Sequence, residues 1–300
     1  MGGGPSKIIE KNIINMKNYP KITVVTPSFN QGEFLEETIH SIIDQGYPNL
    51  EYIICDGGSS DNSIDIIKKY GDSITWWCSE RDKGQTDAIN KGMHRATGDI
   101  VGWINSDDVL FPNSLYLIAE FYNNHKKCEF INGMVAQINR DGTIKRFVHT
   151  IMSKFFMKHG CYNICQQGMF WKRSLFDKLG YLDDTFHAKM DVEWLIRNYE
   201  ANTVVMSLNK PLGAIRVYNE TKTAMGGYIW ERDAAEIRKK YCGKYSPVRS
   251  GFIWYTFILC KFLKGCYLKN WLMCLKYKGK YYWKINKLVQ RVKVPREPVN

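Results

Sequence analysis

The sequence predicts an α/β fold in which a mostly parallel central sheet is flanked by helices and followed by a C-terminal helical extension. Apolar, β-branched runs alternate with helix-like segments four times in the first half of the chain, as is typical of a parallel sheet with helices on both faces. Beyond residue 240, aromatic stretches interleaved with lysine replace this alternation. The 300 residues are enough for one large domain with an appendage.

The strands expected in the first half are apolar runs with the length of buried strands. They are residues 21–26, 50–55, 74–79 and 100–104. Pro27 stops the first run, Asp56 ends the second, and Asn105 follows the fourth. Helices are expected between and after these strands, at residues 33–45, 64–70, 85–96 and 112–124. Apolar residues at helical spacing predict the first helix, and a preceding Ser/Asp cap predicts the second.

The second half of the chain predicts a mixed extension of the sheet, because the alternation fails after residue 125. Residues 129–138 and 143–148 are typical of a hairpin around the turn at Arg140-Asp141-Gly142. Further strands are expected at residues 164–171, 203–208 and 214–217. Further helices are expected at residues 172–179, closed by Gly180, and at residues 187–200.

Polar residues follow all four strands predicted in the first half. They are Thr26-Pro27-Ser28, Asp56, residues 80–82 and Asn105-Ser106-Asp107-Asp108. Ligands of parallel sheets bind in the crevice at the carboxyl ends of the strands. Because these segments all lie at such ends, we expect them to share one polar, acidic crevice.

Two adjacent carboxylates, Asp107 and Asp108, stand at the end of a buried strand, where they repel each other and lose solvation. A divalent cation would offset both effects, and hard oxygen ligands suit Mg²⁺ or Mn²⁺, which also bind substrate phosphates. The alternative is a strand-to-helix turn whose Asp and Asn side chains bind backbone donors. The chain has neither a G-x-G-x-x-G nor a Walker phosphate loop, so a metal at Asp107 would be the natural phosphate holder.

The net charge of +12 is concentrated near the C-terminus. Residues 238–300 contain 16 Lys and Arg against one acid, whereas the rest of the chain has 26 basic and 29 acidic residues. Nucleic acid is not expected as a partner, because its binding proteins more often carry the basic stripe on the folded body. The nine cysteines include no Cys-x-x-Cys pair, and no signal-peptide core is seen, so a reducing, cytoplasmic location is expected.

Several segments stand in a specific order and spacing along the chain. They are Thr26-Pro27-Ser28-Phe29-Asn30, residues 47–52, Asp56-Gly57-Gly58-Ser59-Ser60-Asp61, residues 83–92 and Asn105-Ser106-Asp107-Asp108. Weaker ones follow at Gln166-Gln167, Phe170-Trp171, residues 180–183 and residues 190–197. Together, over about residues 21–225, they resemble the family 2 inverting glycosyltransferases, which have the GT-A nucleotide-sugar-binding fold.

The resemblance implies a pocket for the donor nucleotide at the ends of the first strands. Thr26, Pro27 and Phe29 would line the base pocket, with the Phe29 ring stacking on the base. Asp56 would accept a hydrogen bond from the base imide or a ribose hydroxyl, and Lys83 would approach the phosphates. Core packing of Phe29 and an Asx-turn at Asp56 are the alternatives.

The resemblance also implies the groups that carry the chemistry. Asp107 would bind the metal that bridges the donor diphosphate, with Asn105 as a further ligand, and Asp108 would orient water or sugar. Asp191 would be the general base that takes the proton of the acceptor hydroxyl, as inverting transfer requires. Glu193 is the second candidate for the base, and a solvated helix face is the alternative for Asp191.

Two positions depart from the family's pattern. Asn105 stands where the metal motif often begins with Asp, so it offers an oxygen without charge and the metal affinity would be modest. Tyr218 stands where relatives often carry a metal-binding His, and a neutral phenol is a poor ligand. Either water completes the metal shell, or Arg216 and Lys222 share the phosphate charge.

Residues 241–300 form a basic, aromatic tail. The uncharged run at residues 251–260 is too short to span a bilayer. Apolar aromatic faces interleaved with lysine suit helices that lie in the interface of an anionic membrane, so peripheral membrane contact is expected. The alternative is a helical subdomain that packs on the body with its lysines solvated.

The sequence therefore predicts a metal-dependent inverting glycosyltransferase of the hexosyltransferase type, using Mn²⁺ or Mg²⁺. Residues 21–125 would bind a nucleotide-sugar, with a UDP-sugar favoured, and residues 126–240 would form the acceptor half; residues 1–20 would be a lead-in. The acceptor would be a lipid-linked glycan or an oligosaccharide in bacterial capsule, O-antigen or exopolysaccharide synthesis, at the inner face of the plasma membrane. The alternatives are a nucleotidyltransferase and a non-catalytic sugar-nucleotide-binding or scaffold protein.

Overall fold

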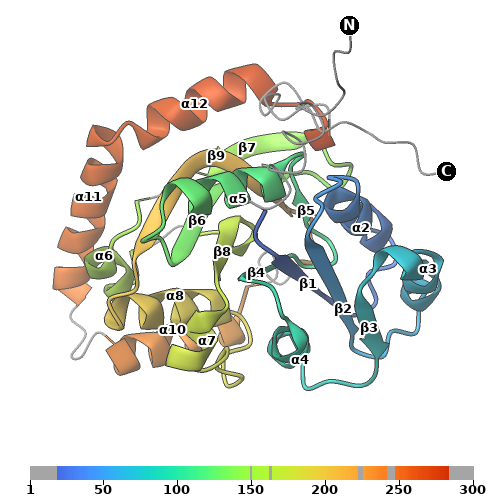
Figure 1. Ribbon diagram of the computed structural model, residues 1–300. Helices are drawn as coiled ribbons and strands as arrows, with labels where there is room; N and C mark the ends of the chain where they lie inside the picture. Colours follow the sequence, from blue (N-terminus) through green and yellow to red (C-terminus); the bar gives the residue numbers. More distant parts are fainter. Residues whose placement is uncertain (1–18, 149–150, 162–163, 222–225, 242–246, 284–300) are drawn as a thin grey trace, which may run out of the picture.

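The computed structural model describes residues 19–148, 151–161, 164–221, 226–241 and 247–283 (Figure 1). Within these residues, the chain forms a nine-stranded sheet in the order β3-β2-β1-β4-β8-β6-β9-β5, with β7 paired to β6. Most of the expected lead-in, residues 1–18, and the last part of the expected tail, residues 284–300, lie outside the described residues.

Four parallel strands form the N-terminal half of the sheet, as the alternating pattern predicts. They are β1 (Ile22–Ser28), β2 (Leu50–Asp56), β3 (Trp76–Ser79) and β4 (Ile100–Trp103). The connecting helices are α2 (Leu35–Ile43), α3 (Ser63–Lys69) and α4 (Gln85–Arg95), and α5 (Ser114–Asn124) follows β4 and the short β5 (Val109–Leu110). A short 3₁₀ turn, η1 (Gly71–Ser73), precedes β3.

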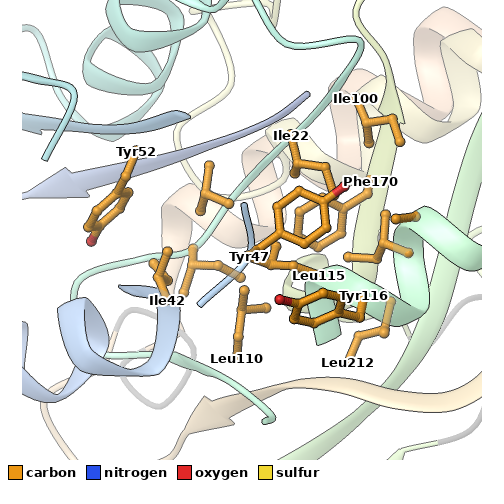
Figure 2. Close-up of a cluster of buried hydrophobic side chains, with 14 of the residues drawn as sticks. Ile22, Ile42, Tyr47, Tyr52, Ile100, Leu110, Leu115, Tyr116, Phe170 and Leu212 are labelled. Atoms are coloured by element: carbon orange, nitrogen blue, oxygen red, sulfur yellow. The ribbon is translucent and has the colours of Figure 1, made fainter. Parts of the chain in front are cut away.

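Helices cover both faces of these strands, because successive strand residues point to opposite faces. In β1, Val24 and Val25 are both fully buried, yet they belong to different clusters. Val24 packs with the helices α2 and α5, on the face that Figure 2 shows around Tyr47 and Tyr116. Val25 packs with α4 and with the second half of the chain. The buried runs of the sequence are therefore sandwiched between two layers.

The second half of the chain extends the same sheet. The predicted hairpin is confirmed as β6 (Phe130–Ile138) and β7 (Ile144–Val148), which pair antiparallel. β8 (Met169–Lys172) is antiparallel to both β4 and β6 and so joins the two halves. β9 (Val205–Arg216) is parallel to β6 and antiparallel to β5.

Two strand assignments in the second half differ from the sequence-based expectation. Residues 203–208 and 214–217 were expected as two strands, but the single strand β9 runs from Val205 to Arg216, because β6 pairs along its whole length and a register shift opposite Met134 accommodates Pro211. The strand expected from residue 164 begins only at Met169, because residues Gln166–Gly168 form a 3₁₀ turn, η2, whose side chains serve the site at the strand ends.

The remaining helices lie beside the second half of the sheet (Figure 1). They are α6 (Lys154–Lys158), α7 (Ser174–Leu179), α8 (Met190–Glu200), α10 (Tyr228–Tyr241), α11 (Pro247–Leu263) and α12 (Cys266–Tyr277). As predicted, Gly180 ends α7, with a φ of +77° that favours glycine. In the part of the chain that the structure describes, no helix is both long and apolar enough to cross a membrane.

Candidate active site

The carboxyl ends of β1, β2 and β4 meet at one edge of the sheet. Ser28 lies beside Asp56 in the β1–β2 register, and Val25 lies beside Trp103 in the β1–β4 register, two residues before Asn105. Asp56 and Asn105 therefore flank the end of β1, about 10 Å apart at the usual strand spacing. The convergence of strand ends that the sequence predicts is present in the fold.

Asp56 holds the turn that follows β2. Its carboxylate accepts hydrogen bonds from the Gly58 and Ser59 amides at 3.1 and 2.8 Å, and from the Ser59 and Ser79 hydroxyls at 2.5 and 2.7 Å. The side chain is buried, and its bonds to the Gly58 and Ser59 amides are those of the Asx-turn alternative. Two of those partners, Ser59 and Ser79, come from separate strand ends, so Asp56 also fixes one wall of the crevice.

The β1 loop places its three predicted base-pocket residues differently. Phe29 is 59% exposed, so the core-packing alternative is wrong for this ring. Thr26 is fully buried and its hydroxyl accepts a hydrogen bond from the Tyr52 hydroxyl at 3.1 Å, which turns it toward the core. Pro27 is buried at the end of the strand. Of the three residues, Phe29 is thus the one whose exposed aromatic ring could stack on a base.

Replacing Phe29 with Ala should weaken binding of the donor nucleotide about tenfold, because a base stacked on an aromatic ring gains about 1–3 kcal/mol. Stability should change by less than about 0.5 kcal/mol, since the ring lies mostly outside the core. Titration calorimetry with the nucleotide would measure the first effect and urea unfolding the second. Phe29→Tyr is the matched control and should retain affinity; a stability loss in Phe29→Ala with affinity unchanged would contradict the stacking role.

The loop after β1 is tied to the loop after β2 and to the end of β9. The Asn30 amide donates to the Ser59 hydroxyl at 2.8 Å. On the other side, the Tyr218 hydroxyl lies 3.4 Å from Gln31 Oε1 and donates to Asp107 Oδ2 at 2.9 Å. Burial, and then the nearby Asp107 charge, raise the pKa of Tyr218, which keeps the phenol protonated as a donor. Tyr218 thus orients the carboxylate of Asp107.

Asp108 is fully buried and held on both oxygens. Oδ1 accepts the Arg216 amide at 2.9 Å, while Oδ2 accepts the side-chain amides of Asn105 at 2.9 Å and Gln167 at 2.6 Å. Burial and the adjacent charge of Asp107 raise the pKa of Asp108 well above its usual range. These three donors engage both of its oxygens, so in this arrangement Asp108 braces the turn that presents Asp107.

Helix α4 connects the donor side of the site to the second half of the chain. Gln85, at the start of the helix, donates to Asn105 Oδ1 at 2.7 Å. The Thr86 hydroxyl donates to the Phe186 carbonyl at 2.9 Å, and the Asn90 side chain bonds both backbone groups of Leu182. Residues 83–92, one of the segments on which the family resemblance rests, therefore hold the loop that leads to α8 by hydrogen bonds.

Lys83 lies in the loop before α4 and is exposed at the same edge. Its backbone amide donates to Asp87 Oδ2 at 3.1 Å, so the loop is closed onto the first turn of the helix. The adjacent Gly84 has a φ of +120°, a value that side-chain-bearing residues rarely adopt, and this lets the chain turn directly into α4. The exposed side chain of Lys83 is therefore available to a ligand at this edge rather than packed in the core.

Asp191 lies in the first turn of α8, half-buried, and its Oδ1 accepts the Val192 amide at 2.8 Å. Burial raises its pKa, while the Val192 amide and the Lys189 charge act in the opposite direction. Burial raises the pKa of the Cys165 thiol to about 12, and the charges of Asp191 and Asp108 add to the rise. The bonds of α4 connect the two sides of the site: Gln85 contacts Asn105, and Thr86 contacts Phe186 in the loop before Asp191.

Glu193, the second candidate for the base, is fully buried two residues further along α8. Its carboxylate pairs with Arg197 at 2.8 Å and Lys240 at 3.1 Å, and it accepts the Tyr241 hydroxyl at 2.5 Å. Glu193 and Arg197 are four residues apart, the spacing at which side chains meet along one helix face. These contacts engage Glu193 in joining α8 to α10, away from solvent.

Sequence reasoning missed Asp233 of α10, which holds the loop before Asp191. Its Oδ2 accepts the amides of three successive residues, His187, Ala188 and Lys189, at 2.9, 2.7 and 3.2 Å. Burial alone would raise the pKa of Asp233, but these amides and Arg232 lower it, so it stays ionised at the start of α8, where negative charge is favoured. The carboxylate and its amide partners are 44 to 46 residues apart, and no local pattern links them.

Arg216 is 1% exposed, so the structure is inconsistent with the suggestion that it shares the phosphate charge. Its guanidinium donates to the carbonyls of Asp107 at 2.9 Å and Arg140 at 2.6 Å, and pairs with Glu37 at 2.5 Å. It therefore ties the end of β9 to the Asp107 turn and to α2, and its donors are used within the protein. Lys222, the other residue of that suggestion, lies outside the described residues.

The residues present fit a divalent cation through Asp107. Among the described residues, no group of three or more His, Cys, Asp or Glu side chains is arranged to hold a metal ion. Asn105 Oδ1 accepts the Gln85 amide, which leaves one lone pair, and Asp108 is engaged by its own three donors. Mg²⁺ is commonly held by one or two carboxylates together with water and substrate phosphates, and a single carboxylate in an acidic crevice suits that manner of binding.

Comparison with known proteins decides the family. The family model described as Glycosyl transferase family 2 matches residues 23–180, which is more than half of the chain and includes the ends of all four parallel strands. The chain belongs to glycosyl transferase family 2. Asp191 and Asp233 lie beyond the matched residues, so their roles rest on their contacts in the structure.

A curated relative agrees with this family, and solved structures share the fold. The chain is 34% identical over 134 residues to the putative teichuronic acid biosynthesis glycosyltransferase TuaG of Bacillus subtilis (strain 168), a match over 43% of this chain and 53% of that protein, or about half its length. The crystal structure of S. aureus TarS 1-349 in complex with UDP-GlcNAc matches with a TM-score of 0.59 and 16% identity, over 81% of this chain and 72% of that one.

The mannosyltransferase PcManGT from Pyrobaculum calidifontis, in complex with GDP-Man and Mn2+, matches with a TM-score of 0.50 and 14% identity, over 81% of each chain. At such identities these likenesses concern the fold alone. They confirm the GT-A-type fold that the resemblance implies. The predicted C-terminal helices are also present in this chain.

Proposed function

We propose that this member of glycosyl transferase family 2 moves a hexose from a nucleotide-sugar to a glycan acceptor with inversion, and that Asp191 is the general base. The observation that carries the proposal is that one helix, α4, contacts both sides of the site: Gln85 donates to Asn105 beside Asp107 and Asp108, and Thr86 donates to the Phe186 carbonyl in the loop before Asp191. Inverting transfer needs a base on the acceptor side and negative charge on the donor side, and these acids would supply both.

The donor would lie across the strand ends. Phe29 would stack on the base, Asp56 and its serine partners would shape the pocket, and Lys83 would approach the phosphates. A UDP-sugar is favoured, in agreement with the UDP-GlcNAc that TarS binds in its complex. Asp107 would hold Mg²⁺ or Mn²⁺, with Asn105 as a weaker neighbour, and such a cation would offset the charge of the departing diphosphate.

Each side chain would then act from a position that its neighbours determine. Tyr218 would orient the Asp107 carboxylate, and Asp108 would hold the turn that carries it. Asp191 would accept the proton of the acceptor hydroxyl as that oxygen attacks the anomeric carbon. Asp233 would hold the loop before Asp191 so that the carboxylate faces the acceptor.

The acceptor would be a lipid-linked or oligosaccharide glycan of a bacterial surface polysaccharide, made at the inner face of the plasma membrane. The name of the Bacillus subtilis relative, which refers to teichuronic acid biosynthesis, supports this class of product. Residues 21–125 would form the donor half, residues 126–240 the acceptor half, and residues 241–300 a peripheral membrane contact. A non-catalytic sugar-nucleotide-binding or scaffold role is the second candidate, because Asn105 and Tyr218 depart from the metal motif.

Thermal-shift screening of UDP, GDP, dTDP and CMP, each with and without Mn²⁺, tests the donor site. UDP with Mn²⁺ should raise the melting temperature most, since a ligand that binds the folded state stabilises it by about 2.7 kcal/mol at a hundred times its Kd. Asp107→Ala should lose the Mn²⁺-dependent part of the shift and keep the part due to the base. If no nucleotide shifts the wild-type melting temperature, the proposed donor site is wrong. If Mn²⁺ adds nothing to the shift, the proposed metal site is wrong.

A further inference from the structure

Helices α11 and α12 each present an apolar face to the body and a second apolar face to solvent. Figure 1 shows them running along the outside of the molecule, past α6, β7 and β9 and on the side away from α3. On α11, Ile253 and Phe257 are 4% and 1% exposed and pack with Phe156 of α6. On α12, Met273 and Tyr277 pack with Phe147 of β7. The body-facing contacts account for one side of each helix only.

The outward face of α11 has helical spacing of its own. Phe252, Tyr255, Leu259 and Phe262 recur at intervals of three and four residues, and their exposed fractions are 75%, 76%, 55% and 69%. The inward residues of this helix, one turn apart, lie on the opposite side. A helix that is apolar on both faces is buried on both in an ordinary globular protein, and none of the residues that the structure describes covers the outward face.

Helix α12 has an outward apolar face of the same kind. Leu268, Trp271, Leu272 and Leu275 follow the helical spacing i, i+3, i+4 and i+7, and they are 58%, 58%, 52% and 66% exposed. Together with the four residues of α11 they form what we call the outward apolar face. Such a set of large exposed side chains marks an interaction surface, because soluble proteins rarely leave contiguous apolar patches of this kind uncovered.

The charged residues of the segment that carries α11 and α12 have a single sign. Residues 247–283 contain seven Lys and Arg and no Asp or Glu. The lysines that lie exposed on and beside the two helices are Lys264, Lys269, Lys276, Lys278 and Lys280. A second copy of this chain would bring the same positive charge to the contact, and like charges across an interface are unfavourable. The occupant must therefore be apolar and rimmed by negative charge.

We propose that the outward apolar face of α11 and α12 docks on an anionic lipid bilayer, with both helices lying in the plane of the interface. Aromatic and aliphatic side chains would enter the boundary between headgroups and acyl chains, while the lysines would bind the anionic headgroups. Helices that lie flat need no membrane-spanning length, in agreement with the shortness of both. This inference deepens the proposed membrane contact by naming the helices and the face that make it.

Sedimentation of the full chain with vesicles tests the proposal. The wild type should pellet with phosphatidylcholine vesicles that contain phosphatidylglycerol, and at least about tenfold more weakly with phosphatidylcholine alone, because the lysines are attracted to an anionic surface. Phe262→Ser with Leu275→Ser should reduce binding by about tenfold or more at any salt concentration. Lys264→Gln with Lys269→Gln and Lys276→Gln should remove the preference for anionic vesicles and the dependence on salt.

Controls separate this proposal from its alternatives. Lys68→Gln, an exposed charge removed from the distant helix α3, should leave vesicle binding unchanged. Melting temperature and the nucleotide-induced thermal shift should match the wild type in every variant, so a failure of the transferase proposal would be visible separately. A wild type that stays in the supernatant with anionic vesicles would overturn the inference. So would a dimer in light scattering that Phe262→Ser with Leu275→Ser dissociates, because the occupant would then be a second copy.

Discussion

An Asp191→Asn variant should lose sugar transfer by about 10²–10⁴-fold, because general-base catalysis supplies a factor of that size and the amide cannot accept the proton. Binding of the donor nucleotide should stay within about twofold of the wild type, since the proposed role of Asp191 is toward the acceptor. Initial rates of transfer and of donor hydrolysis would measure the first effect, and calorimetry the second. Equal, negligible rates in wild type and variant, with nucleotide binding intact, would instead favour the scaffold function.

The same residue should set the acid limb of the pH profile. The base acts only when ionised, so kcat/KM should fall as the pH drops through its pKa. Burial raises the pKa of Asp191, so the fall should begin at a higher pH than for an exposed aspartate. Glu193→Gln is the matched control: it leaves Arg197 and Lys240 without their buried partner, so it should lower stability but leave this limb in place. If the acid limb moved in Glu193→Gln and persisted in Asp191→Asn, Glu193 rather than Asp191 would be the general base.

Replacing Arg216 with Met should destabilise the protein by about 3–5 kcal/mol, the usual cost of removing one partner from a buried ion pair. The change would leave the Glu37 carboxylate and the Asp107 and Arg140 carbonyls without their donor. Urea unfolding at pH 7 would measure the loss. Transfer should fall as well, because the turn that carries Asp107 would lose its guanidinium contact with β9 and keep only the backbone bond from residue 216 to Asp108 and the bond from Tyr218 to Asp107.

An exposed arginine provides the comparison for this variant. Arg146 of β7 lies on the surface, where its guanidinium donates to Gln137 at 2.7 Å, and Arg146→Met should change stability by less than about 0.5 kcal/mol. If Arg216 were a phosphate ligand, Arg216→Met would keep the wild-type stability and lose nucleotide affinity. That outcome would contradict the structural role that its burial indicates.

Much of the site could be predicted from the sequence, because strand ends are local features. Pro27, Asp56 and Asn105 each follow an apolar run, and a parallel sheet must bring such ends to one edge. The resemblance then assigned roles to these positions and to Asp191. The departures at Asn105 and Tyr218 were also visible in the sequence, but their consequence was not: Tyr218 contacts Asp107 as a hydrogen-bond donor, and Asn105 holds Asp108.

Long-range contacts could not be predicted in this way. Asp233 shows no pattern that would single it out, yet it accepts three successive amides beside Asp191. The exposure of Phe29 and the burial of Thr26, three residues apart, likewise depend on where β1 ends and its loop begins. In the tail, the sequence indicated aromatic faces and lysines, and only the packed helices distinguish the inward Phe257 from the outward Phe262.

By itself, the sequence determined the alternation of strands and helices, the polar strand ends and the basic tail, because periodicity, side-chain branching and charge act between near neighbours. The tertiary structure alone decided which donors meet which acids. The Arg216 amide reaches Asp108 across 108 residues of chain, and its guanidinium is buried rather than offered to a phosphate. Such a contact forms only when β9 joins the sheet beside the Asp107 turn, and packing across the whole domain sets that position.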